Sequence, residues 1–167
     1  AKVGDGDTGS TFAEGARDIA QKLANNQLPL NDAAALLQLI GERLATVMGG
    51  SSGVLMSIFF TAAGQKVADG AALPDALLAG LAQMKHYGGA APGDRTLIDA
   101  LQPALEALRD SDLRTAAQAA QQGAEATAKM AKAGAGRSSY VNKENLDGVM
   151  DPGAVAVAEV LNVLARQ

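Results

Sequence analysis

Apolar residues recur every three or four positions along most of the chain, and clusters of Gly, Pro, Asn and Asp separate the apolar runs. This spacing is typical of amphipathic α-helices, in which one face repeats every 3.6 residues. Within residues 31–48, for example, Leu37, Ile40 and Leu44 share one stripe, and Gly49 ends the run. The pattern predicts seven helices, near residues 10–24, 31–48, 51–68, 74–86, 94–108, 112–133 and 153–165.

Residues that favour helix starts precede several of these segments. Asp32 supplies a capping oxygen before the second helix, and Asp94 is expected to cap the fifth. Asp151 followed by Pro152 indicates a helix start, because Pro suits the first turn. The sixth segment has Ala and Gln on nearly every face, so it is either closely packed or partly exposed.

The composition favours a single all-helical domain. The chain has 36 alanines but only 21 Val, Ile and Thr residues together, and β-branched residues are the ones that favour strands. Its 167 residues are enough for one domain with its own core. We therefore expect one all-α domain of antiparallel helices over residues 1–167.

Charge and residue types exclude several classes of function. The 18 acidic and 14 basic residues give a formal charge of -4, which argues against a nucleic-acid-binding protein. With no Cys and one His, the chain lacks the ligands of a zinc site, although oxygen ligands for hard cations are present. The most apolar stretch, residues 54–64, is too short to span a membrane. No export signal is found, so a cytoplasmic location is expected.

The first candidate site lies in the loop Gly4–Thr11. Asp5 and Asp7 are two residues apart, so in an extended segment their carboxylates project to the same side. Such a pair could hold Mg²⁺ beneath a nucleotide, while the hydroxyl residues that follow lie where helix N–H groups favour an anion. The alternative is an ordinary Gly/Asp turn with a capping side chain.

Other polar loops are equally open to two interpretations. Ser51 and Ser52, after Gly49-Gly50, either hold phosphate or cap a tight interhelical turn, and no Walker A sequence is present. Arg95 and Arg137 either face a site or lie in solvent. The single imidazole, His86, is interpreted as a partner at a helix end rather than a general base.

In their order and spacing, these loops together resemble the ATP-binding DhaL-type domain of dihydroxyacetone (glycerone) kinases. The resemblance covers essentially the whole chain and rests on residues 4–9, 48–53, 87–96, 136–140 and 151–154. It implies a barrel of eight antiparallel amphipathic helices, of which about seven fall within this chain. The family's metal motif has three Asp, the first of which would precede Ala1. We therefore expect that the chain lacks its first helix and is the C-terminal part of a longer kinase.

The resemblance also implies roles for individual residues. Asp5 and Asp7 would coordinate two Mg²⁺ ions that bridge the phosphates of ATP. The implied nucleotide contacts are Thr8, Gly9, Ser10, Thr11, Ser51, Ser52, Gly88, Leu97, Arg137, Asp151, Pro152 and Gly153. No base or nucleophile is implied on this chain, because phosphoryl transfer depends on positioning and charge stabilisation.

The implied function is ATP- and Mg²⁺-dependent phosphoryl transfer to dihydroxyacetone or glyceraldehyde, as in glycerol metabolism. In the family a separate DhaK-type domain or subunit binds the triose through a His that cannot be His86. This chain would then be half of an active site, inactive on triose alone, within a full-length homodimer. Some animal members also cyclise FAD, and no residue here decides for or against that activity.

Two alternatives stay open. The chain could be the DhaL subunit of a phosphotransferase-system kinase, in which ADP is a bound cofactor. Thr8, where that subunit more often has His, favours the ATP-dependent form. The second alternative is a non-catalytic helical module that binds an apolar ligand or a protein partner.

Overall fold

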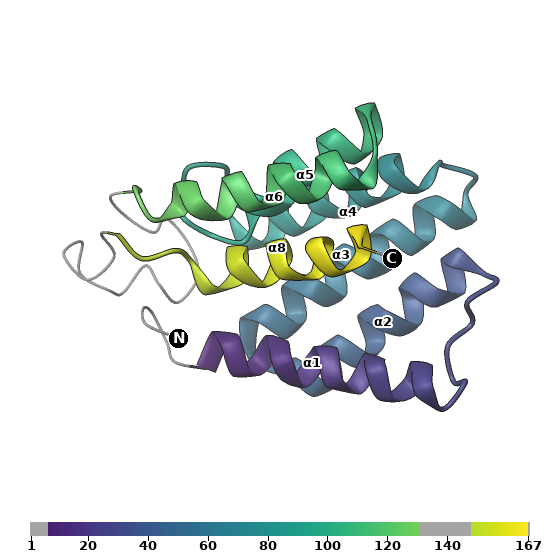
Figure 1. Ribbon diagram of the computed structural model, residues 1–167. Coiled ribbons are helices and arrows are strands. Elements are labelled where there is room, and N and C mark those ends of the chain that lie inside the picture. Colours follow the sequence, from purple (N-terminus) through teal and green to yellow (C-terminus); the bar gives the residue numbers. More distant parts are fainter. Residues whose placement is uncertain (1–6, 131–147, 167) are drawn as a thin grey trace. The chain divides into compact units, whose positions relative to one another are not determined.

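The computed structural model describes residues 7–130 and 148–166, and every regular element within these residues is an α-helix (Figure 1). The all-α prediction is therefore confirmed. With the labels of Figure 1, the helices are α1 (Asp7–Ala24), α2 (Ala33–Met48), α3 (Gly50–Ala68), α4 (Leu73–Gly88), α5 (Ile98–Asp110), α6 (Leu113–Thr127) and α8 (Pro152–Ala165). None of these described helices is both long and apolar enough to cross a membrane.

The chain forms two compact units, which are described one at a time. The first unit comprises residues 10–87 and contains α2, α3 and most of α1 and α4. The second comprises residues 1–9 and 88–167 and contains α5, α6 and α8.

In the first unit, α2 and α3 form an antiparallel pair. Gly64, near the end of α3, lies against the Ala34 carbonyl at the start of α2, and Gly53 lies against the Leu44 carbonyl. A single residue, Gly49, joins the helices with a φ of 67°, a backbone angle that glycine adopts without strain. The apolar stripe predicted on α2 is buried in part, at Leu37 and Leu44, and the end of the Leu44 side chain lies against Gly15 of α1.

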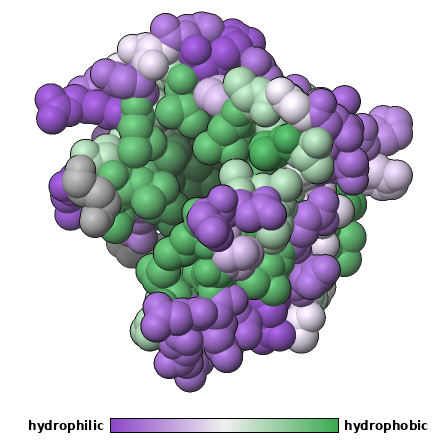
Figure 2. Space-filling view, turned by 90° about the vertical axis from the view of Figure 1, so that its right-hand side faces the viewer, coloured by the Kyte–Doolittle hydropathy of each residue, from purple (hydrophilic) through white to green (hydrophobic). Residues whose placement is uncertain are grey.

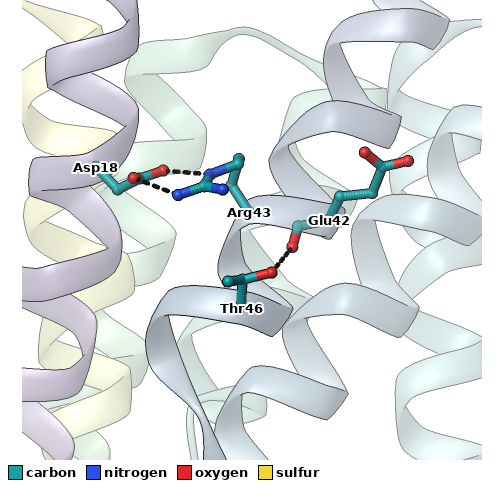
Figure 3. Close-up of polar contacts among 4 residues, drawn as sticks. All are labelled: Asp18, Glu42, Arg43 and Thr46. Carbon is teal, nitrogen blue, oxygen red and sulfur yellow. Dashed lines mark hydrogen bonds and ion pairs between the residues drawn. The ribbon is translucent and has the colours of Figure 1, made fainter.

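The outer helices of the first unit are held by different contacts. Gly80 of α4 lies against the backbone carbonyl of Phe59 in α3, so these two helices approach closely. On the other side, Arg43 of α2 forms a two-pronged ion pair with Asp18 of α1, at 2.8 and 3.0 Å (Figure 3). Helix α1 is thus attached to α2 by a polar contact as well as by packing.

In the second unit, α5, α6 and α8 pack through small residues. Its core consists of alanines from all three helices: Ala100, Ala104, Ala116, Ala120, Ala124, Ala154 and Ala158. Because alanine side chains are short, the helix backbones can approach closely, and Gly123 of α6 lies directly against the Asp99 backbone of α5. The Ala-rich segment is therefore closely packed on one face, whereas Gln118, Gln122 and Glu125 of the same helix are exposed.

Two helix boundaries differ from the predictions by four residues or more. The fifth helix was expected from residue 94, but α5 begins at Ile98 because Arg95 adopts a left-handed φ of 61°, which is incompatible with a continuing helix. The sixth helix was expected to continue to residue 133, but α6 ends at Thr127 with Ala128 as its C-cap, and residues 128–130 are not helical. Residues 131–133 of the prediction lie outside the described residues.

Both polar and apolar side chains reach the surface, as the mixed purple and green of Figure 2 shows for one face. Val160, Val163 and Leu164 of α8 are exposed, whereas Ala154 and Ala158 of the same helix are buried. These spacings place the exposed and the buried residues on different sides of α8. The helix is therefore apolar on its outer side as well as on its core side.

Candidate functional site

The residues expected to bind a nucleotide are found in both units. The first turns of α1 contain Asp7, Thr8, Gly9, Ser10 and Thr11. Asp5 and Arg137 lie outside the residues that the structure describes. The predicted start of this helix at residue 10 is thus three residues late.

Ser51 and Ser52 belong to the first unit and lie in the first turn of α3. Gly49 is the N-cap of this helix, so of the two alternatives left open for the serines, the capping one does not hold. Ser51 is exposed and Ser52 is partly exposed. The first N–H groups of a helix have no partner within the helix, so this turn offers both hydroxyl and amide donors.

In the second unit, Leu97 and the turn Asp151-Pro152-Gly153 lie in contact. A Cβ added to the buried Gly153 would lie 3.1 Å from Cβ of Leu97 and 3.2 Å from a carboxylate oxygen of Asp151. Glycine therefore allows the start of α8 to approach the segment that precedes α5. Gly88, at the end of α4, belongs to the same unit.

Asp151 fixes the start of α8. Its carboxylate accepts a hydrogen bond from the Ala154 N–H at 3.0 Å, and its own N–H donates to Oγ1 of Thr127 at 2.8 Å. The predicted cap, with Pro152 in the first turn, is confirmed. Burial raises the pKa of the Asp151 carboxyl, while the Ala154 N–H and the charge of Arg95 oppose this shift.

Arg95 is the charged side chain at the centre of this region. It is 0% exposed, and Nη2 of its guanidinium donates to the backbone carbonyl of Val149. Burial lowers the pKa of Arg95, and the nearby carboxylate of Asp151 opposes this shift. Of the two alternatives left open for Arg95, a position in solvent is therefore excluded.

The loop before α5 is held by Asp99 rather than by Asp94. Asp94 accepts from the Ala91 N–H within the loop, so its predicted role as a helix cap was wrong. The buried carboxylate of Asp99 accepts from the N–H groups of Gly93 and Thr96, at 2.6 and 2.8 Å. The sequence analysis missed Asp99, although the spacing Thr96-x-x-Asp99 is that of a capping box.

Thr127, at the end of α6, is a second residue that the sequence analysis missed. It is 0% exposed, and its hydroxyl donates to the Ala124 carbonyl while accepting from Asp151. A threonine in an Ala-rich helix gives little signal in the sequence, because its partner lies 24 residues away. The region around Leu97 and Asp151 is thus built from four buried polar residues: Arg95, Asp99, Thr127 and Asp151.

His86 lies in the last turn of α4, with its ring edge to face against Tyr87 at a centroid distance of 5.4 Å. This position fits the interpretation of a helix-end partner. No cluster of three or more potential metal ligands occurs among the residues that the structure describes. The prediction of a magnesium site at Asp5 and Asp7 stays a prediction, since Asp5 lies outside the described residues.

Comparison with known proteins identifies relatives over the whole chain. The model of the DAK2 domain matches residues 2–166. The chain is 64% identical to a dihydroxyacetone kinase of Citrobacter freundii and 41% identical to the human triokinase/FMN cyclase. These alignments cover 99% and 97% of this chain but only 30% of each relative, so the chain spans less than a third of their length.

The fold is also that of a solved relative. The crystal structure of the C. freundii dihydroxyacetone kinase in its native form has a TM-score of 0.86, with 60% identity over 99% of this chain and 29% of that one. The crystal structure of the C. freundii enzyme in complex with AMP-PNP and Mg²⁺ has a TM-score of 0.82 and 57% identity over the same shares. The chain belongs to the DAK2 domain family and corresponds to the ATP-binding DhaL-type part of dihydroxyacetone kinases.

Proposed function

We propose that this chain binds MgATP and supplies the phosphoryl donor to a kinase that acts on dihydroxyacetone. The proposal rests on one structural observation in particular. Leu97 and the Asp151–Gly153 turn, which the family resemblance assigns to the nucleotide, are 54 positions apart in sequence and yet lie in contact. The relative crystallised with AMP-PNP and Mg²⁺ has the same fold at 57% identity, which supports this assignment.

The residues of the chain would have distinct tasks. Asp5 and Asp7 would hold Mg²⁺, which when bound offsets the negative charge of the phosphates. The first turn of α1 and Ser51 and Ser52 offer N–H and hydroxyl groups to phosphate or ribose oxygens. Leu97, Gly88, Arg137 and the turn at Asp151 would contact the rest of the nucleotide. These residues bind and orient the donor, so no general base is needed on this chain.

The comparisons favour the ATP-dependent form over the phosphotransferase-system form. The relatives named dihydroxyacetone kinase and triokinase contain this domain as about 30% of a longer chain. A kinase of that kind exchanges ADP for ATP after each turnover, whereas a protein with ADP as a cofactor retains it. The rate at which bound ADP exchanges with free ATP distinguishes the two forms.

Titration calorimetry with ATP tests the metal and nucleotide assignment. We expect binding that depends on Mg²⁺, and at least an approximately tenfold loss of affinity in Asp7→Asn, because one oxygen ligand of the metal loses its charge. Asp75→Asn is the matched control, since Asp75 is an exposed aspartate in the first turn of another helix, α4. Equal affinity of the Asp7 and Asp75 variants would overturn the metal assignment. An absence of Mg²⁺-dependent binding in the unmodified chain would overturn the proposed function.

A further inference from the structure

Two segments that contribute to the proposed nucleotide site are connected by the side chain of Arg95. Arg95 lies two positions before Leu97, and the carbonyl that its guanidinium binds, that of Val149, lies two positions before Asp151. The side chain thus joins the loop before α5 to the segment before α8. Resting on the proposed function, we infer that Arg95 is a positioning residue that sets the separation of these two nucleotide-binding segments.

Both the burial and the backbone conformation of Arg95 are energetically unfavourable, which suggests that its side chain has a specific role. Its guanidinium is completely buried, although burying a charge is costly unless the charge is well compensated. Its backbone has a φ of 61°, a left-handed conformation that L-residues other than Asn, Asp and Gly rarely adopt. Strained residues persist where the surrounding structure holds them, and such places are often functional sites.

The groups that Arg95 connects are themselves held to helices. Asp99 of α5 binds the N–H groups of Gly93 and Thr96 on either side of Arg95, which fixes the loop. Thr127 of α6 accepts from the Asp151 N–H, and the Ala128 carbonyl accepts from the Gly148 N–H at 2.8 Å. Each segment is therefore anchored to a helix, and the guanidinium of Arg95 spans from one anchored segment to the other.

A planar guanidinium suits this task better than an ammonium. Arg presents several N–H donors in a rigid fork, and Arg95 combines a bond to a neutral carbonyl with attraction to the nearby Asp151 carboxylate. Lysine would keep the charge but lose the fork. The inference therefore predicts that Arg95→Lys restores only part of the function that Arg95→Gly loses.

The test compares two ligands on the same protein. We expect Arg95→Gly, which keeps a residue suited to the left-handed backbone, to weaken MgATP binding at least tenfold while Mg²⁺-tripolyphosphate binding changes less than twofold. This selectivity is expected because the Arg95 segments are assigned to the part of the nucleotide beyond the phosphates. Methylguanidinium added to Arg95→Gly should recover MgATP affinity. An equal loss for both ligands, or no loss, would overturn the inference.

A second pair of variants tests the anchoring without removing a buried charge. Thr127→Val removes the hydroxyl that binds the Asp151 N–H at nearly constant shape, and Thr127→Ser keeps it. We expect the Val variant to lose affinity for MgATP but not for Mg²⁺-tripolyphosphate, and the Ser variant to retain its affinity for both. Circular dichroism gives the unfolding temperature of each variant, and binding is measured well below that temperature. Equal MgATP affinity of the Thr127→Val and Thr127→Ser variants would contradict the proposed anchoring of Asp151 by Thr127. Failure of the unmodified chain to bind MgATP would instead remove the proposed function itself, so the two failures are distinguishable.

Discussion

At the scale of single residues, Gly123 has the least room for a side chain among the glycines that the structure describes in the second unit. A Cβ there would lie less than 3.0 Å from three backbone atoms of α5, including 2.9 Å from Cα of Ala100. Backbone atoms of a packed helix cannot move aside individually. The Asp99 carbonyl, which lies against Gly123, would normally accept a helical hydrogen bond from the N–H of residue 103. Residue 103 is Pro, which has no N–H, so that bond is missing. Gly123 therefore sets how closely α6 packs on α5.

We expect Gly123→Ala to lower the free energy of unfolding by about 3 kcal/mol, the upper part of the usual range for overpacking. Gly15→Ala is the control, because the nearest atom there is the mobile end of the Leu44 side chain, at 2.8 Å. That variant also gains helix propensity of about 1 kcal/mol, so its net effect should be small. Urea denaturation of both variants measures the difference. Equal free energies of unfolding for Gly123→Ala and Gly15→Ala would show that α5 and α6 can move apart without loss of stability.

Sequence reasoning succeeded at residues whose partners are local. The caps Asp32 and Asp151 bind N–H groups three positions away, so the residues at the start of the helix are enough to predict their role. Arg95 and Thr127 have partners 54 and 24 positions away, and no local pattern indicates such contacts. The polar network around Asp151 therefore required the structure, whereas the assignment of the turn itself came from the family resemblance.

At the scale of helices, the ion pair between α1 and α2 predicts a defined dependence on pH. The hydrogen bonds from Arg43 hold the pKa of the Asp18 carboxyl below its ordinary value of 3.8. A lowered pKa in the folded state means that the unfolded chain binds the proton more readily. The stabilisation from Asp18 is therefore fully present above the unfolded pKa and is lost as the pH falls through the folded pKa.

We expect Asp18→Asn to reduce stability slightly at pH 7 and to have no effect on stability at a pH below the folded pKa of Asp18. The effect at pH 7 is small because both side chains are partly exposed, at 31% for Arg43 and 17% for Asp18, and exposed ion pairs contribute little. Glu42→Gln is the control, since Figure 3 shows its carboxylate directed away from Arg43. Thermal unfolding of the three proteins between pH 2 and pH 7 measures the effect. A pH-independent difference between Asp18→Asn and the unmodified chain would exclude the ion pair as its cause.

Helix boundaries show which information was missing from the sequence. The apolar period correctly predicted α2, because its buried Leu37 and Leu44 belong to the expected stripe. The start of α5 was placed four residues early because Asp94 was interpreted as its cap, whereas Asp99 binds the N–H groups of Gly93 and Thr96 in a loop there. Periodicity reports which residues face a core, and a helix start is set by the hydrogen bonds of the preceding loop.

At the scale of the whole molecule, the relatives are much longer than this chain. About 70% of each of them lies outside the part that this chain matches. Binding of MgATP requires oxygen ligands and N–H donors, which we propose that this chain supplies. Holding a triose in line with the donor requires a second set of groups, which the family resemblance assigns to a DhaK-type domain.

We therefore expect the 167-residue chain to bind MgATP but to form almost no dihydroxyacetone phosphate from MgATP and dihydroxyacetone. Addition of the DhaK-type part of the C. freundii kinase should produce turnover, because the sequence is 64% identical to that enzyme over the matched domain. A coupled assay for dihydroxyacetone phosphate, with each protein alone as control, measures this. Arg95→Gly in the mixture should raise the KM for MgATP, because the variant weakens nucleotide binding. Robust turnover by this chain alone would contradict the division of the active site between two parts.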